Sequence, residues 1–188
     1  MRANTADGFA VGVFRPLQIS LGGGADTLDV KAVSTTGDAY AIQDASATLG
    51  GAGPIDLGAG NDRLEAVAMG AAGRDGVGVW ASDIFLGDGN DFVYVRGSSQ
   101  GVYVSSFHGG AGDDVFDLQS GTATVYGDTG KDKLILQGKA SDYTFDNASA
   151  EAGHVHIVSA AFGTDMNVYA VEKFEFGDKT LPYDVLVA

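Results

Sequence analysis

Apolar residues recur at every second position in five blocks of the chain. The blocks read ISLGGGADTLDV (19–30), IDLGAGNDRLEA (55–66), IFLGDGNDFVYV (84–95), FHGGAGDDVFDL (107–118) and VYGDTGKDKLIL (125–136). Each begins with an apolar residue, passes through a glycine-rich stretch ending in Asp, and places apolar residues two and four positions after that Asp. A period of two turns one face of a strand toward a core. Each block is therefore predicted to be a strand, a glycine turn and a second strand.

A weaker repeat lies between these blocks. The stretches DGFAV (7–11), DAYAI (38–42), DGVGV (75–79) and QGVYV (100–104) share a polar residue, a small residue and then alternating apolar positions. We predict that they form a middle strand in each long repeat, lost only between the fourth and fifth blocks. The Asp residues of the blocks are separated by 36, 29, 23 and 18 residues. This predicts an all-β solenoid of stacked parallel strands whose coils taper over residues 1–136.

Composition narrows the classes of partner. The chain has 188 residues with 45% hydrophobic content, which is enough for one domain with a sizeable core. Its 29 glycines and three prolines indicate many tight turns. The net charge of −14 argues against nucleic acid and anionic membrane surfaces as partners and favours cations. There is no Cys for disulfides or thiolate metal sites, and no apolar run long enough to suggest membrane insertion.

The glycine turns place like charges together. Stacked parallel strands put the five Asp residues near one line, about 5 Å apart, where their charges repel one another. Glycine lets the backbone adopt positive φ and brings carbonyl oxygens close together. Ca²⁺ takes six to eight such oxygen ligands, whereas Mg²⁺ demands a rigid octahedron and keeps its waters. We therefore predict Ca²⁺ between adjacent turns, with up to four ions in the four gaps.

The blocks resemble the nonapeptide repeats of the repeats-in-toxin (RTX) family, with the pattern G-G-x-G-x-D-x-apolar-x. The resemblance implies a right-handed parallel β-roll with Ca²⁺ between successive turns, bound by turn carbonyls and by the Asp at the sixth position. Carried over to this chain, the metal site residues are Gly22, Gly23, Gly24, Asp26, Gly58, Ala59, Gly60, Asp62, Gly87, Asp88, Gly89, Asp91, Gly109, Gly110, Ala111, Gly112, Asp114, Gly127, Asp128, Thr129, Gly130 and Asp132. The opposite turn, QSGT, carries no Asp, so a single row of ions is expected. Asn61, Asn90 and Asp113 at the fifth position are expected to bond to the backbone of their own turn.

The end of the chain resembles the segment that follows the repeats in such proteins. This resemblance rests on ASDYTF (140–145) and VYAVEKFEFGDKTLPYDVLVA (168–188), and the ending DVLVA is similar to the ends of proteins exported by type I secretion. It implies a secreted or cell-surface location. We expect residues 137–188 to form a C-terminal β cap and secretion signal. We also expect the 188-residue chain to be part of a larger secreted protein.

Other functions are weighed against this one. The sequence lacks G-x-S-x-G, H-E-x-x-H, P-loop and Cys-nucleophile motifs, so we predict no enzyme activity in this chain. One alternative is a carbohydrate- or ice-binding adhesin module on a calcium scaffold. Another is the accessory C-terminal module of a secreted polysaccharide-modifying or hydrolytic enzyme. Trp80, Tyr94 and Tyr103 could form a surface for a glycan, although such aromatic residues more often pack between strands. His154 and His156 could hold a transition metal.

Overall fold

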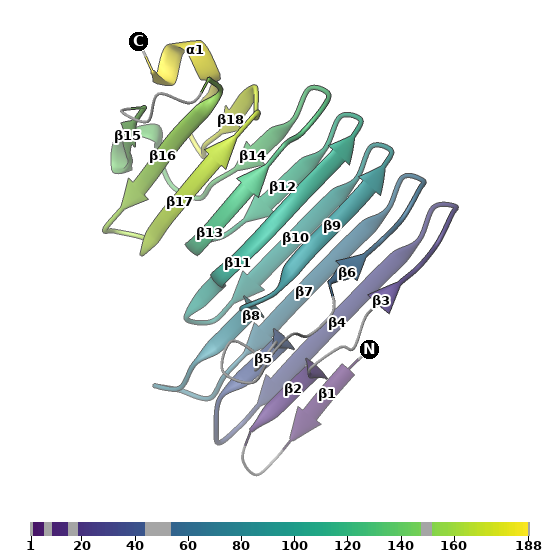
Figure 1. Cartoon of the computed structure of the whole chain (residues 1–188). Helices are drawn as coiled ribbons and strands as arrows, with labels where there is room; N and C mark the ends of the chain where they lie inside the picture. Colours follow the sequence, from purple (N-terminus) through teal and green to yellow (C-terminus); the bar gives the residue numbers. More distant parts are fainter. Residues whose placement is uncertain (1, 6–8, 15–18, 44–53, 148–151, 188) are drawn as a thin grey trace.

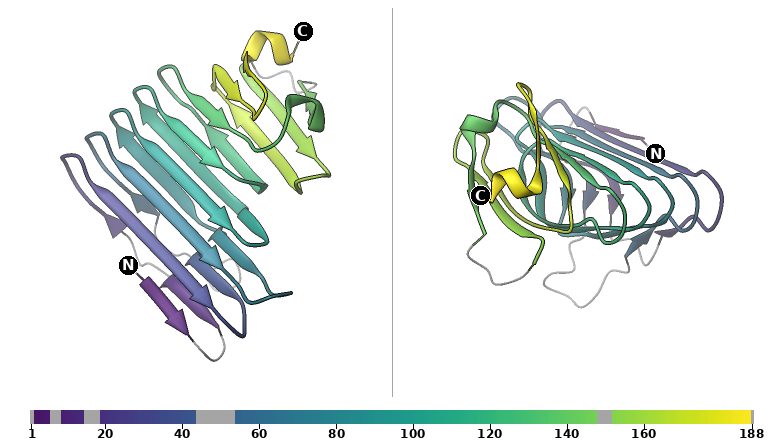
Figure 2. Two further views of the ribbon diagram at one scale, coloured as in Figure 1. Left: turned by 180° about the vertical axis from the view of Figure 1, so that it is seen from behind. Right: turned by 90° about the horizontal axis from the view of Figure 1, so that it is seen from above.

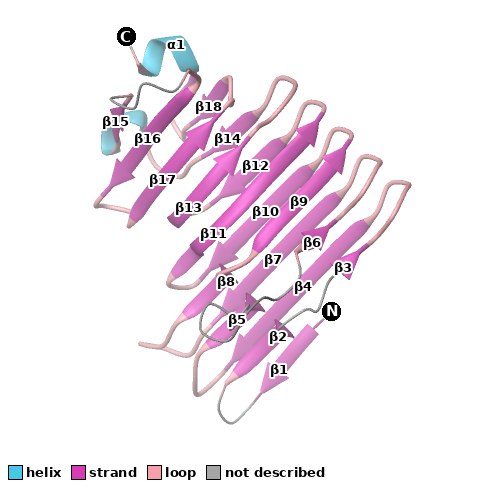
Figure 3. Cartoon of the chain, in the orientation of Figure 1, coloured by secondary structure: helices cyan, strands magenta, loops and turns pink. Residues whose placement is uncertain are grey.

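The computed structural model describes residues 2–5, 9–14, 19–43, 54–147 and 152–187. Within these ranges the regular structure is almost entirely β-strand (Figures 1 and 3), with a 3₁₀ turn at Ala140–Asp142 and a short helix, α1 (Tyr183–Leu186). Among the described residues, neither helical segment is long and apolar enough to cross a membrane. The all-β prediction is confirmed. The first two residues of the stretch at 7–11 and the final residue, 188, lie outside the described residues.

The first sheet, sheet A, contains the strands that follow the glycine turns. Its order is β1 (Arg2–Thr5), β4 (Thr27–Ser34), β7 (Arg63–Met69), β10 (Phe92–Gly97), β12 (Val115–Leu118), β14 (Lys133–Ile135), β18 (Lys173–Glu175) and β19 (Thr180–Pro182). Every neighbouring pair is parallel except β18 with β19. Such a sheet requires the chain to leave and return between successive strands.

The second sheet, sheet B, contains the strands that precede the turns. Its main path is β15 (Thr144–Asp146), β16 (His154–Ser159), β17 (Thr164–Tyr169), β13 (Gly121–Tyr126), β11 (Gln100–Ala111), β8 (Gly76–Trp80), β5 (Ala39–Gln43) and β2 (Ala10–Phe14). A side path joins β3 (Ile19–Ser20), β6 (Ile55–Asp56) and β9 (Asp83–Asp88) to β11. The pairs are parallel except those of β16 with β15 and β17.

The middle strands merge one repeat earlier than the sequence predicted. The stretches at 38–42 and 75–79 form β5 and β8, as expected. The stretch at 100–104 is instead the first half of the 12-residue strand β11. One half of β11 pairs with β8 and the other half with β9. On its other side, β11 pairs with β13, and the register of that pair shifts between Tyr103 and Ser105. The shorter spacing to the next Asp leaves no residues for a separate middle strand.

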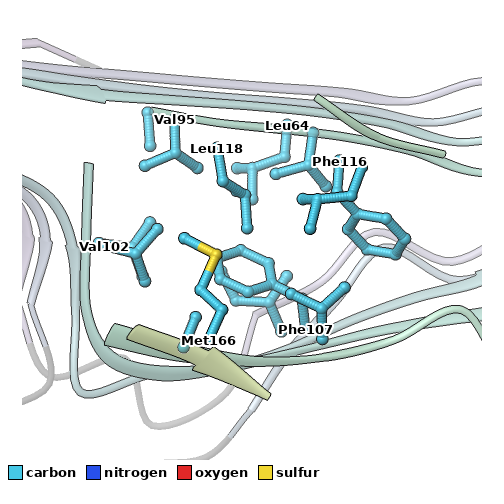
Figure 4. Packing of buried hydrophobic residues seen from close by; sticks show 14 of the residues in the cluster. Leu64, Val95, Val102, Phe107, Phe116, Leu118 and Met166 are labelled. Carbon is cyan, nitrogen blue, oxygen red and sulfur yellow. The ribbon is translucent and has the colours of Figure 1, made fainter. Parts of the chain in front are cut away.

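The core lies between the two sheets. The apolar residues two positions after each turn Asp stack in register along sheet A, Leu64 beside Val93, Val93 beside Phe116, and Phe116 beside Leu134. These four are fully buried. Figure 4 shows Leu64 and Phe116 facing Phe107 and Met166 of sheet B. The period-two pattern therefore identified the buried face correctly.

The C-terminal residues extend both sheets and then end their parallel stacking. Strand β17 adds to β13 in parallel, and β18 adds to β14 in parallel. Antiparallel strands follow, β16 and β15 on sheet B and β19 on sheet A. Figure 2 shows this end of the molecule with α1 beside it. Antiparallel partners therefore replace the next parallel strand at the end of the stack on both sheets.

Candidate metal centre

The five glycine turns lie in a row along one edge of the molecule, each joining a strand of sheet B to a strand of sheet A (Figure 1). We number them one to five along the chain, and number the six residues of each turn so that Asp is sixth. The sixth residues form one column, which we call the aspartate column. It consists of Asp26, Asp62, Asp91, Asp114 and Asp132. The four later members are at most 2% exposed. The structure thus brings together the five predicted Asp residues.

One carboxylate oxygen of the aspartate column bonds from turn to turn. The Oδ1 atom of each later Asp accepts a hydrogen bond from the backbone N–H of the Asp one turn before it. The N–O distances are 2.6 Å from Asp26 to Asp62, 2.6 Å from Asp62 to Asp91, 2.8 Å from Asp91 to Asp114 and 2.8 Å from Asp114 to Asp132. Hydrogen bonds of this kind hold the carboxylates in place and fix the register of the turns.

The other oxygen, Oδ2, is buried without a hydrogen-bond partner in all five residues of the aspartate column. Burial raises the pKa of Asp114 to about 7 and that of Asp132 to about 6, and neighbouring acidic groups add to both increases. The pKa of Asp91 is raised for the same first reason. A buried charge without a partner is strongly unfavourable. No hydrogen-bond donor of the described residues reaches this second row of oxygens.

In turns three and four, the second and fourth positions require glycine. Gly87 and Gly89 have φ angles of 106° and 134°, and the equivalent residues of turn four have 95° and 130°. A Cβ atom at any of these positions would overlap a carbonyl oxygen of the preceding turn. Asp128, at the second position of turn five, adopts φ of 63° without glycine. Its Oδ2 accepts a hydrogen bond from the N–H of Gly110, at 3.2 Å, which ties the turn to its neighbour.

The predicted carbonyl ligands are partly engaged by the stacking. The second-position carbonyl of one turn accepts from the third-position N–H of the next, as between Gly58 and Asp88 at 2.9 Å. The third-position carbonyl accepts from the fourth-position N–H of the turn before, as between Ala111 and Gly89 at 2.6 Å. A carbonyl oxygen has two lone pairs, so one hydrogen bond leaves acceptor capacity for a cation.

The fifth-position side chains form a second row that runs in the opposite direction. Asn61 Oδ1 accepts from the N–H of Asn90, Asn90 Oδ1 from the N–H of Asp113, and Asp113 Oδ1 from the N–H of Lys131, at 2.9, 2.8 and 3.0 Å. The expectation that these side chains bond within their own turn is wrong. The stacking offers each of them a free N–H in the next turn, and this contact is available only in the folded structure.

Glu172 continues the aspartate column and was missed in the sequence. Its Oε2 accepts from the N–H of Asp132 at 2.7 Å, and the N–H of Lys173 bonds to the carbonyl of Asp132 at 3.1 Å. The same two contacts join each pair of turns above it. A signal was present, because VY at 168–169 and KF at 173–174 match VY at 125–126 and KL at 133–134. The connecting turn is three residues shorter and lacks the glycine pattern, which concealed the match.

No protein-family model matches the chain, and no curated protein matches its sequence. The argument for a metal site therefore depends on the geometry of the turns. Within the described ranges, no cluster of three or more His, Asp or Glu side chains could hold an ion. An ion in this row would instead need backbone carbonyls beside the carboxylates, which is a donor set that Ca²⁺ accepts.

The other candidate residues are placed as follows. Tyr94 lies on sheet A with the guanidinium of Arg96 4.3 Å from its ring centre. Trp80 and Tyr103 meet edge to face on sheet B, 5.6 Å apart. The structure therefore does not gather the three aromatic residues into one surface. On β16, His156 Nε2 lies 2.7 Å from Asp165 Oδ1, while His154 Nε2 lies 3.2 Å from Asn167 Oδ1.

Proposed function

We propose that this chain is a calcium-binding β-solenoid module of the RTX type, whose folding is coupled to Ca²⁺ and which forms part of a larger secreted protein. The observation that carries the proposal is the aspartate column, in which five buried Oδ2 atoms have no partner. Native proteins rarely leave buried polar atoms unsatisfied, and a bound ion is one explanation for such a cluster of them.

Calcium fits the chemistry of the turns better than other cations. The donors around the column are carboxylate and carbonyl oxygens, which hard cations prefer. There is no Cys for a thiolate site. Ca²⁺ accepts six to eight oxygen ligands in a flexible geometry, whereas Mg²⁺ demands a near-ideal octahedron and retains several waters. A divalent ion also offsets part of the net charge of −14.

The coupling between calcium and folding follows from mass action. The unfolded chain has no preformed site, so an ion that binds only the folded state adds about 2.7 kcal/mol of stability at a concentration one hundred times its dissociation constant. Calcium is far more concentrated outside cells than inside. The proposed module therefore stays unfolded during export and folds once it is outside.

The two predicted parts have different roles in this proposal. Residues 1–136 carry the five turns, and residues 137–188 act as the end cap and secretion signal. The cap role is supported by the antiparallel strands β15, β16 and β19, which end the parallel stacking on both sheets. The export role is supported by the resemblance of the last residues to type I secretion signals.

Circular dichroism with chelator and then with Ca²⁺ tests the proposal. We expect little β structure and a low melting temperature in chelator, and recovery of both with Ca²⁺ but not with the same concentration of Mg²⁺. A spectrum and melting temperature that chelator leaves unchanged would contradict calcium-coupled folding.

Carbohydrate binding is the second candidate function, favoured by a groove on the outer face of sheet B. The groove has a volume of about 260 Å³, and Asp83, Ser106, Thr124 and Asn167 line it with polar side chains. None of the described strands of sheet B contains Lys or Arg. An uncharged glycan therefore fits this face better than an acidic one. Retarded migration in gels containing neutral polysaccharide, abolished by Thr124→Trp, would support this function, and unretarded migration would exclude it for the polysaccharides used.

A further inference from the structure

We infer that Ca²⁺ binds only at the C-terminal end of the aspartate column, in the gap between turns four and five and in the gap between turn five and the tail. This inference rests on the proposed calcium function and specifies its sites. It differs from an equal row of four ions in two respects. The gaps between turns one and four hold no ion, and the tail, which lacks a glycine turn, contributes to a site.

The first position of the turns divides the column into two parts. Turns one to three have leucine there, at residues 21, 57 and 86, and turns four and five have Gly109 and Gly127. Leu57 and Leu86 are fully buried in the core. Leu86 and Gly109 occupy equivalent places, because the next residues, Gly87 and Gly110, pair in register with similar φ angles.

Glycine at the first position makes room beside the carboxylate. Neither Gly109 nor Gly127 has a positive φ, so backbone conformation does not require glycine there. A Cβ atom on Gly109 would instead lie 2.5 Å from Asp114 Oδ2 and 2.6 Å from the carbonyl oxygen of Gly127. These distances are shorter than atoms in contact allow. The missing side chain is what permits the two oxygens to approach the same point.

Two oxygens that both lie close to the place of a Cβ atom on Gly109 can bind one cation between them. Asp114 Oδ2 and the Gly127 carbonyl oxygen are no more than about 5 Å apart, since each lies within 2.6 Å of that point. The carboxylate oxygen has no donor, and no backbone N–H of the described residues donates to the Gly127 carbonyl. Without an ion, the two oxygens repel each other. Ca²⁺ contacts oxygen at about 2.3–2.6 Å and can bridge them.

The same arrangement recurs between turn five and the tail. Asp132 Oδ2 lies 2.6 Å from the place of a Cβ atom on Gly127, and the carbonyl oxygen of Ala170 lies closer still. Asp132 is fully buried, and its Oδ2 also has no partner. Glu172, which bonds to the N–H of Asp132, adds a second carboxylate beside this gap. The tail therefore supplies a carbonyl and a carboxylate where a sixth turn would have supplied them.

The earlier turns have the unpartnered oxygen but not the space. Asp62 and Asp91 also have a buried, unpartnered Oδ2, so that feature alone does not distinguish the turns. Leu57 and Leu86 are fully buried and hold the position that is glycine in turns four and five, so we infer that their side chains fill the space that glycine leaves open there. Apolar atoms there exclude an ion and its ligands. Turns one to three, with leucine at the first position, are held by the core and by hydrogen bonds between turns. Turns four and five, with glycine there, have the same contacts and, in this inference, bound ions as well.

Counting the ions by isothermal titration of the 188-residue chain with CaCl₂ tests the inference. We expect two ions per chain. Asp132→Asn keeps the hydrogen bond to the N–H of Asp114 but removes the charge, and should reduce the count to one. Asp62→Asn is the matched control, because it makes the same change in a leucine turn, and should leave two ions bound. Circular dichroism in excess Ca²⁺ verifies that each variant is folded.

The outcomes separate this inference from the proposed function. Four ions, or the loss of an ion in Asp62→Asn, would overturn the two-site assignment while calcium binding itself stands. Two ions in Asp132→Asn would overturn the site at the tail. An absence of heat and of bound calcium in equilibrium dialysis would overturn the proposed function. If Asp132→Asn does not fold, Glu172→Gln, which alters an exposed residue, should lower calcium affinity at one of two sites, and unchanged affinity at both would contradict the inference.

Discussion

Replacing Asp114 with Asn removes a fully buried charge and keeps its shape. Asn has the same acceptor for the N–H of Asp91, at 2.8 Å in the parent protein. Its amide nitrogen takes the place of the unpartnered Oδ2 and can donate to the nearby carbonyl of Gly127. The substitution therefore turns a repulsive contact into an attractive one when no ion is present, and removes an ion ligand when calcium is present.

The pKa of Asp114 sets the size of the effect. The pKa is raised from 3.8 to about 7, mainly by burial. The folded state binds this proton more tightly than the unfolded state, so protonation of Asp114 stabilises the fold. That contribution is fully present below pH 3.8 and is lost as the pH rises toward 7. The loss is about 4 kcal/mol above pH 7, at about 1.4 kcal/mol for each pH unit. The Asn side chain does not ionise, so the Asp114→Asn variant does not lose this stability as the pH rises.

Urea unfolding, followed by circular dichroism in chelator and in Ca²⁺, measures this effect. In chelator at pH 7.5, we expect Asp114→Asn to be more stable than the parent protein by about 2–4 kcal/mol. The difference should shrink as the pH falls toward 4, and its sign should reverse in excess Ca²⁺. Asp113→Asn, an exposed neighbour with the same change of charge, should change little. If Asp114→Asn is the less stable protein in chelator at pH 7.5, the reasoning is refuted.

Three further predictions follow from the packing. Gly89→Ala should lower the melting temperature sharply, because its φ is 134° and a Cβ would overlap the Gly60 carbonyl, while Gly23→Ala, with nothing closer than 3.8 Å, should not. Equal effects would show that the close approach is unimportant. Phe174→Ala should lower the unfolding free energy by about 3–5 kcal/mol in denaturant titration, because the ring is fully buried; a loss under 1 kcal/mol would contradict the packing. Truncation after Gly138 should yield a chain that associates in light scattering or fails to fold, whereas a stable monomer would show that the tail is not a cap.

The sequence by itself determined the strands and the buried face. Apolar residues at period two, punctuated by glycine, are local signals, and they located the turns and the buried positions such as Leu64 and Phe116. The repeated spacing also placed the five Asp residues at equivalent positions, and the structure brings them together in a column. Local pattern suffices here because each repeat meets the same neighbours as the one before it.

Tertiary structure decided which contacts the repeated residues make. The two rows of side chains that bond between turns, through Asp62 in one direction and Asn61 in the other, depend on the neighbouring turn. The merging of two strands into β11 depends on the length left between turns. Glu172 joined the column although its turn is too short to show the motif. Such contacts link residues tens of positions apart, so backbone stacking fixes them and local sequence pattern does not.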